Sequence, residues 1–126
     1  MAKYHNIKVV DPVHGTFDSK AEYARWVQLR LMEKVGAIKQ LERQVPFVLN
    51  TPDTRGKIVS IGKYVADFTY TNDEGLVVED VKGVITALFR WKARHFLIQY
   101  GFPITIVGHV KKKRRAVRNS ERGKRK

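Results

Sequence analysis

The chain has 126 residues, of which 43% are hydrophobic, so it is long enough to fold as one compact domain with its own core. It contains no cysteine, which excludes disulfides and thiolate metal sites. No run approaches the roughly 20 apolar residues that span a membrane, and the first ten residues, MAKYHNIKVV, lack the apolar core of a secretory signal. We therefore expect a cytoplasmic protein.

The formal net charge is +13, and most of it lies at the C-terminal end. Residues 111–126 hold ten Lys and Arg against one Glu, a net charge of +9, which leaves +4 for the other residues. Such a segment is expected to bind a polyanion such as nucleic acid. The alternative is a solubilising or targeting tail. The chain is therefore divided into a folded domain, residues 1–110, and a basic tail, residues 111–126.

The first part of the chain predicts an irregular segment and then a helix. Residues 1–17 contain several turn-forming residues and no clear periodicity. A helix is expected to begin at Ser19, because Ser19 and Glu22 match a capping box, and to end at Gly36. Apolar residues recur near helical spacing and are expected to face the core. They are Tyr23, Val27, Met32 and Val35.

Three strands are predicted next. QVPFVLN, residues 44–50, is a β-like run that Pro46 weakens. KIVSIGKYVADFTYT, residues 57–71, is rich in β-branched and aromatic residues, and Gly62 marks a bulge or bend within it. The turn TNDEG separates it from GLVVEDVKG, residues 75–83. These last two segments are therefore expected to pair as a β-hairpin.

A second helix and a last strand complete the predicted elements. VITALFRWKARHFLIQYG, residues 84–101, has helical periodicity and ends at Gly101, and PITIVGHV, residues 103–110, is β-like. The order α-β-β-β-α-β predicts an α+β or α/β domain with a mostly mixed sheet. Both tryptophans, Trp26 and Trp91, are expected in the core rather than as platforms for base stacking. The expected core face of this helix carries Leu88, Trp91, His95 and Ile98.

Basic residues on this second helix form another expected face. Arg90, Lys92 and Arg94 are placed either to contact phosphates or to remain as a solvated helix face. Phosphate contacts of this kind give affinity rather than sequence preference.

Acidic and basic residues gather where the hairpin ends. Alternation along a strand puts Asp80 and Lys82 on one face, about 6.6 Å apart, and Glu79 on the other. The hairpin brings Asp67, from the preceding strand, into the same region as Asp80. Two carboxylates can bind Mg²⁺, and a lysine beside them can stabilise a hydroxide nucleophile or a phosphate. The alternatives are cross-strand charge pairs on a solvated face and, for Glu22, a simple helix cap.

The segments FDSKAE, YVADF and VEDVKG together resemble the PD-(D/E)XK nuclease superfamily. That superfamily carries an acid on its first helix, an Asp on one strand and (D/E)-x-K on the next. The likeness covers residues 14–108, and the separation of 13 residues between the two Asp positions is similar to archaeal-type Holliday junction resolvases. It looks closer still to small phage nuclease-like proteins. The matching residues here are Glu22, Asp67, Asp80, Val81 and Lys82.

The resemblance implies a restriction-endonuclease-like core, in which helices flank a central mixed β-sheet. It also implies that Asp67 and Asp80 hold Mg²⁺, which Mn²⁺ can replace, with help from the backbone carbonyl of Val81. Lys82 would position or activate the attacking water. Glu22 would complete the metal shell, directly or through a water molecule.

The implied function is a Mg²⁺-dependent DNA endonuclease that acts on branched or four-way-junction DNA as a homodimer. A non-catalytic nucleic-acid-binding protein is the alternative from another class, although converging carboxylates give no advantage to a protein that only binds phosphates. A restriction-type, transposase-type or RNA-directed nuclease is also open. The expected DNA-binding residues are Arg90, Lys92, Arg94, Lys111, Lys112, Lys113, Arg114 and Arg115.

Three positions qualify the resemblance. Ala66 precedes Asp67 where the superfamily motif has proline, at a position that is loosely kept. A strand bulge would exchange Glu79 for Asp80 as the metal ligand. Related nucleases sometimes place a polar residue at the edge of the site after the first helix, and Gln44 is the residue in that place.

Overall fold

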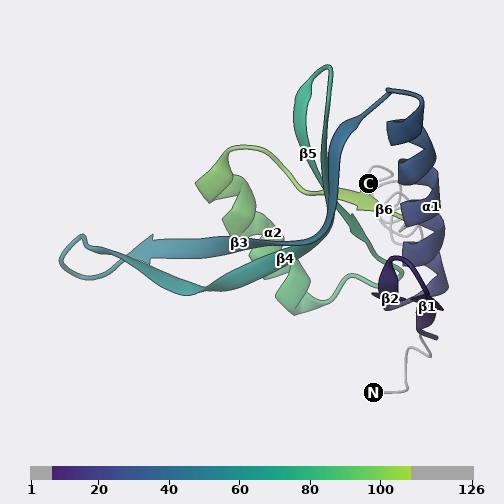
Figure 1. Cartoon of the computed structure of the whole chain (residues 1–126). Helices are drawn as coiled ribbons and strands as arrows, with labels where there is room; N and C mark the ends of the chain where they lie inside the picture. Colours follow the sequence, from purple (N-terminus) through teal and green to yellow (C-terminus); the bar gives the residue numbers. More distant parts are fainter. Residues whose placement is uncertain (1–6, 109–126) are drawn as a thin grey trace, which may run out of the picture.

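The computed structural model describes residues 7–108, which form an α+β domain (Figure 1). A short hairpin precedes the elements predicted from the sequence, whose order α-β-β-β-α-β is confirmed. The bounds are β1 Val9–Asp11, β2 Gly15–Phe17, α1 Lys20–Lys34, β3 Lys39–Pro52, β4 Ile58–Asn72, β5 Gly75–Val81, α2 Ala87–Tyr100 and β6 Thr105–Val107.

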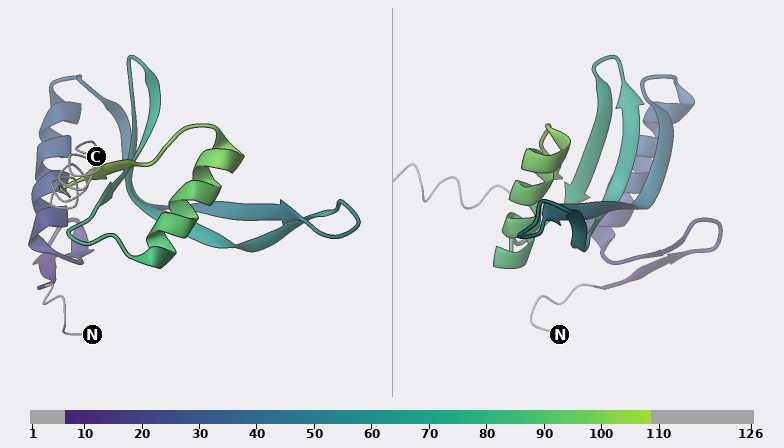
Figure 2. Two further views of the ribbon diagram at one scale, coloured as in Figure 1. Left: turned by 180° about the vertical axis from the view of Figure 1, so that it is seen from behind. Right: turned by 90° about the vertical axis from the view of Figure 1, so that its left-hand side faces the viewer.

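The main sheet is mixed, and a helix covers each of its faces. Its strand order is β3-β4-β5-β6, with the first three strands antiparallel and β6 parallel to β5. The right-hand view of Figure 2 shows α1 and α2 on opposite sides of these strands. This arrangement matches the predicted restriction-endonuclease-like core. Beyond the sheet, β3 and β4 continue together as a long two-stranded arm (Figure 1).

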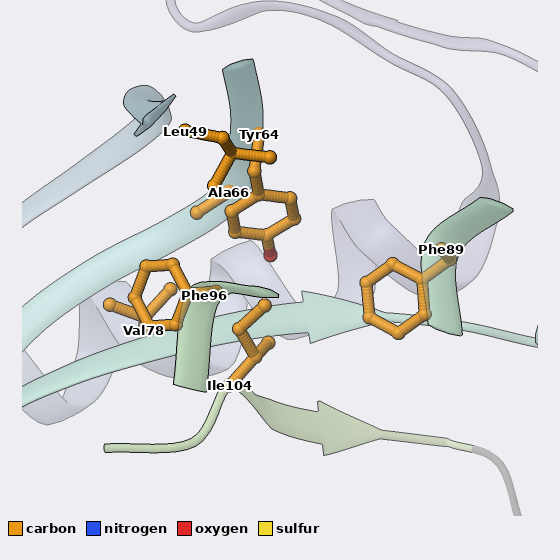
Figure 3. Packing of buried hydrophobic residues seen from close by; sticks show 7 residues of the cluster. All are labelled: Leu49, Tyr64, Ala66, Val78, Phe89, Phe96 and Ile104. Carbon is orange, nitrogen blue, oxygen red and sulfur yellow. The ribbon is translucent and has the colours of Figure 1, made fainter. Parts of the chain in front are cut away.

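Each helix closes its own hydrophobic cluster against the sheet. The two clusters draw side chains from opposite faces of the strands, which is why both faces of β4 are apolar. The cluster under α2 comprises Leu49, Tyr64, Ala66, Val78, Phe89, Phe96 and Ile104 (Figure 3). The cluster under α1 comprises Phe17, Trp26, Leu29, Ile38, Phe68 and Tyr70.

Helix α1 begins as predicted but buries a different stripe. The Ser19 hydroxyl accepts a hydrogen bond from the Glu22 backbone N–H at 3.1 Å, which confirms the cap. The buried residues are Glu22, Trp26 and Leu29, so the core face lies about one residue round the helix from the expected one. Of the residues expected in the core, Tyr23 and Met32 are partly buried against the cluster under α1, whereas Val27 and Val35 are exposed. The spacing of apolar residues predicted the wrong face because the buried stripe includes the charged residue Glu22.

Helix α2 carries two apolar stripes, and the sequence pattern selected the wrong one. Thr86 caps its start and Gly101 ends it in a left-handed conformation. Phe89 and Phe96 are buried against the sheet, whereas Trp91 is 79% exposed. The placement of Trp91 in the core was therefore wrong, and that of Trp26 was right. Both stripes have helical spacing, so periodicity alone could not distinguish them. Leu88 and Ile98 are also exposed, and His95 is half-buried.

Residues 9–17, which were expected to be irregular, form a hairpin in which β1 pairs with β2 at the foot of α1 (Figure 1). Two tertiary contacts hold these three-residue strands. Phe17 is fully buried in the cluster under α1, and the Tyr23 hydroxyl donates to Asp11 Oδ2 at 2.7 Å. Strands this short are set by such contacts rather than by local pattern, which explains why the sequence did not reveal them.

The strand predictions hold with one extension. The partner of Leu49 is Gly62 and that of Asn50 is Ser60, so Ile61 is the extra residue of a bulge beside Gly62. The β4–β5 hairpin has its predicted turn. Strand β3 is twice as long as expected and tolerates Pro46 because it lies at the edge of the sheet.

None of the helices within residues 7–108 is both long and apolar enough to cross a membrane. The end of the last predicted strand and the basic tail, residues 111–126, lie outside the described residues.

Candidate active site

The β3–β4 ladder lacks one pair at Asp67. Arg43 pairs with Phe68 and Val45 pairs with Ala66 in the same register, and the described ladder has no Gln44–Asp67 pair between them. Gln44 has a φ of 56°, a conformation that non-glycine residues rarely adopt and that clusters at functional sites. Ala66 and Phe68 accordingly belong to different clusters, although simple alternation would place them on one face.

Asp67 and Asp80 come together across the β4–β5 pair. Phe68 pairs with Glu79, which puts Asp67 and Asp80 at adjacent positions of the two strands, and Asp67 Oδ2 accepts a hydrogen bond from the Val81 backbone N–H at 2.8 Å. Burial, followed by the charge of Asp80, raises the pKa of Asp67 from 3.8 to about 7. The two carboxylates are therefore close enough to disfavour double ionisation when nothing positive lies between them.

Two further side chains hold the Asp80 carboxylate, which is almost fully buried. The Tyr64 hydroxyl donates to Asp80 Oδ2 at 2.5 Å, and the Lys82 ammonium lies 3.2 Å from Asp80 Oδ1. Lys82 Nζ also lies 4.4 Å from the centre of the Phe89 ring, a cation–π distance. Burial and the Asp80 charge raise the pKa of the Tyr64 hydroxyl, which keeps it a donor. Asp80 is thus fixed on both oxygens.

Glu79 faces the other side of β5 and has partners of its own. Arg25 from α1 donates to both of its carboxylate oxygens, at 2.9 and 2.6 Å, and the Tyr70 hydroxyl donates to it as well. Glu79 is 1% exposed, so this paired charge belongs to the core under α1. The strand has no bulge here, and Asp80 rather than Glu79 faces Asp67. The bulge that would exchange Glu79 for Asp80 is therefore absent.

Glu22 lies near the two aspartates but is held by different groups. Its Oε1 accepts from the Asp18 backbone N–H and its Oε2 from Gln44 Nε2, both at 3.2 Å, while Arg43 lies 3.8 Å away. Burial first, and then the charges of Asp18 and Asp80, raise the pKa of Glu22. The charge of Asp80 therefore acts on the pKa of Glu22 across the site, although the hydrogen bonds of Glu22 go to Asp18 and Gln44.

One open cavity of about 720 Å³ contains all of the predicted catalytic groups. The first turns of α1 and α2 both border it, so the positive ends of two helix dipoles face the same space. Such an arrangement favours a bound anion. The predicted residues that line it are Glu22, Asp67, Asp80, Val81 and Lys82, joined by Gln44, Lys63, Tyr64 and Lys92.

The donor groups fit Mg²⁺ rather than a metal that needs a complete protein cage. Among the described residues, no three or more His, Cys, Asp and Glu side chains are grouped so as to hold a metal ion. Mg²⁺ does not need such a group, because it is commonly bound by one or two carboxylates and keeps several waters and substrate phosphate oxygens. Asp67 and Asp80 can provide that kind of site, and a bound cation would relieve the repulsion between them.

The predicted DNA-binding residues of α2 do not form one face of the site. Lys92 lines both the cavity and a neighbouring groove, whereas Arg94 lines only the groove. Arg90 is exposed and borders neither space. The tail residues Lys111, Lys112, Lys113, Arg114 and Arg115 lie outside the described residues.

Sequence reasoning missed Tyr64 and Arg25 and gave no structural reason for Gln44. Tyr64 looks like an ordinary core aromatic, and its role depends on the hydrogen bond between its hydroxyl and Asp80 on the neighbouring strand. Arg25 meets a partner 54 residues away, which no local pattern reveals. Of these residues, only Tyr64 could have been suspected from the sequence, because a tyrosine hydroxyl buried in a core requires a hydrogen-bond partner.

A family model described as "Protein of unknown function (DUF1064)" matches residues 1–114. No curated protein and no solved structure matches the chain.

Proposed function

We propose that this chain, which belongs to the DUF1064 family, is a Mg²⁺-dependent nuclease that hydrolyses phosphodiester bonds in DNA. The observation that carries the proposal is the pair of aspartates that meet across β4 and β5, with Lys82 3.2 Å from Asp80, in one open cavity. The sequence resemblance to PD-(D/E)XK nucleases supports the same reading.

Asp67, Asp80 and the Val81 carbonyl would hold the metal. When bound, Mg²⁺ supplies positive charge for the scissile phosphate and makes a coordinated water easier to deprotonate. The protein contributes orientation. Tyr64 and Lys82 fix the two oxygens of Asp80, and the Val81 N–H fixes Asp67 Oδ2, so little rearrangement is needed when substrate arrives.

Lys82 would stabilise negative charge on the attacking water and on the phosphate. Its ammonium lies between Asp80 and the Phe89 ring, so it is held in place yet remains partly exposed to the cavity. A fixed cation in a partly desolvated site stabilises developing charge more strongly than one in bulk water. Glu22 and the Gln44 amide together would hold a water molecule at the opposite edge of the site.

A protein that only binds nucleic acid would not benefit from this arrangement. Burial, and after it the charge of Asp80, raises the pKa of Asp67, so this carboxylate lies where its ionisation is unfavourable. Such placement reduces folding stability and repels phosphate, and both penalties disappear when a divalent cation binds. The acidic pair therefore favours metal-dependent chemistry over simple DNA binding.

The proposed substrate is branched or four-way-junction DNA, processed during recombination or phage DNA metabolism. This part rests on the likeness to junction resolvases and small phage nuclease-like proteins. Symmetric cutting of two strands favours a homodimer. The location proposed for a protein with such a substrate is the cytoplasm of a bacterial or phage-infected cell.

The test is cleavage of end-labelled four-way junction, flap, linear duplex and single-stranded DNA, each with Mg²⁺ and with EDTA. We expect Mg²⁺-dependent products from at least one branched substrate, and Mn²⁺ should replace Mg²⁺. A protein that binds all four substrates but cuts none with either metal would contradict the proposal.

A further inference from the structure

A second cavity, an apolar groove of about 620 Å³, lies between α2 and the arm formed by β3 and β4. Its apolar lining includes Ile61 on the arm and Leu88, Trp91 and Ile98 on α2. All four side chains are more than half exposed, and Trp91 is 79% exposed. Large apolar side chains grouped in this way on the surface indicate a binding site rather than ordinary surface composition.

Helix α2 is already hydrogen-bonded to the arm along one side, so the two cannot pack closer together and fill the groove. The His95 ring lies 2.7 Å from the Asn50 carbonyl, Gln99 Nε2 donates to the Val48 carbonyl, and the Tyr100 hydroxyl donates to the same carbonyl. These bonds fix the spacing between helix and arm. The contact between α2 and the arm therefore forms without Trp91, whose side chain remains exposed.

The charge of the groove selects the kind of partner. Lys63, Lys92 and Arg94 line it, and no acidic residue does. Within residues 7–108 none of these three cations has an ion-pair partner. A second copy of this chain would bring the same positive charges to the same place. The complementary partner is a polyanion that also presents flat apolar surface.

The groove is continuous with the candidate active site. Lys63, Leu88 and Lys92 line both spaces, so a strand whose phosphate lies near Asp67 and Asp80 can continue over α2 without leaving the protein surface. The two lysines would follow its backbone from one space to the other.

We propose that this groove binds an unpaired DNA strand, with a base stacked on Trp91 and the backbone held by Lys63, Lys92 and Arg94. Bases inside a duplex have both faces covered, so away from the duplex ends only an unpaired base can stack on an exposed indole. The proposal rests on the proposed nuclease function for its biological meaning. It narrows the substrate to DNA that has a single-stranded segment next to the cut.

The test measures binding without metal, so it does not depend on cleavage. Labelled single-stranded DNA, RNA of the same sequence and blunt duplex are titrated in EDTA with wild-type full-length protein and with Trp91→Ala and Trp91→Phe. Leu31→Ala is the control, because Leu31 is an exposed apolar residue on α1, outside the groove. We expect Trp91→Ala to weaken single-stranded DNA binding by roughly 5- to 100-fold, and Trp91→Phe to retain most of the affinity.

Intrinsic fluorescence gives a second readout. Trp26 is buried, so quenching by single-stranded DNA should come from Trp91 and vanish in Trp91→Phe. Duplex affinity should change less than two-fold in Trp91→Ala. Equal loss for duplex and single strand, no loss for either, or a dimer in sedimentation that Trp91→Ala dissociates would overturn the proposal.

The two proposals can fail separately. If no substrate is cut but Trp91→Ala still loses single-strand affinity, the nuclease assignment fails and the groove stands. If DNA is cut and Trp91→Ala binds every substrate like the wild type, the groove assignment alone fails.

Discussion

Replacing Asp67 with Asn should stabilise the metal-free protein while removing its cleavage activity. Asn has nearly the same shape and keeps an oxygen that accepts the hydrogen bond from the Val81 N–H. It removes the charge that burial and Asp80 make unfavourable. A substitution that improves stability and removes function is typical of a site built for a ligand.

The magnitude follows from the pKa of Asp67, which is raised from 3.8 to about 7. At about 1.4 kcal/mol per pKa unit, the full shift would correspond to about 4 kcal/mol at neutral pH and above. Asp67 is only half-buried, so solvent screening reduces this figure, and we expect a gain of about 1–2 kcal/mol.

The gain should depend on pH in one direction. Because the folded pKa lies above the unfolded one, ionisation of Asp67 opposes folding. The penalty is absent below about pH 4, grows between about pH 4 and 7, and is complete above pH 7. The free energy of unfolding of Asp67→Asn should therefore exceed that of the wild type by more at pH 8 than at pH 4.

Urea unfolding in EDTA at a series of pH values measures this difference, because the other titrating groups are common to both proteins. Saturating Mg²⁺ should reduce or reverse it, since only the wild type keeps both carboxylates. Asp73→Asn, the same change at an exposed position of the β4–β5 turn, is the control. A variant no more stable than the wild type at pH 8, or a gain independent of pH, would refute the reasoning.

Three further outcomes are expected. Lys82→Ala should lower the cleavage rate at least 100-fold while calorimetry shows Mg²⁺ affinity within a few-fold of wild type; lost Mg²⁺ binding with normal chemistry at saturating metal would indicate a structural lysine. Tyr64→Phe removes the donor to Asp80 Oδ2 and should lower apparent Mg²⁺ affinity or activity by about 10- to 100-fold, and unchanged metal dependence would contradict the positioning role. Deleting residues 111–126 should weaken DNA binding and flatten its salt dependence without moving the cut sites, whereas equal salt slopes would show that the tail does not contact DNA.

The parts of the fold that local chemistry determines could be predicted from the sequence. Ser19 caps α1 because its hydroxyl meets an unpaired backbone N–H, and Gly62 sits at the bulge of β4 because glycine tolerates its φ of 145°. Strand alternation separated Asp80 from Glu79 correctly, since the end of β5 remains regular. Each of these inferences depends on residues within a few positions of one another.

The remaining features depend on contacts between distant segments. The positive φ of Gln44 and the broken pairing opposite Asp67 carry no sequence signal, yet they shape the site. The apolar stripe that contains Trp91 and the one that contains Phe96 both have helical spacing. The way in which α2 packs on the sheet decides which stripe is buried. Tyr64 acquires its role through its hydrogen bond to Asp80, which is 16 residues away in the sequence.

The measurement that decides most directly whether this is a nuclease is cleavage by wild type and Asp80→Asn, with Asp73→Asn as the matched control. A labelled four-way junction is incubated with each protein in Mg²⁺ and in EDTA, and binding is measured in parallel. We predict Mg²⁺-dependent cutting by the wild type and by Asp73→Asn. Asp80→Asn should cut at least 100-fold more slowly but still bind the junction as well or more tightly, because a charge that repels phosphate is gone. Undiminished cutting by a folded Asp80→Asn would contradict the assignment.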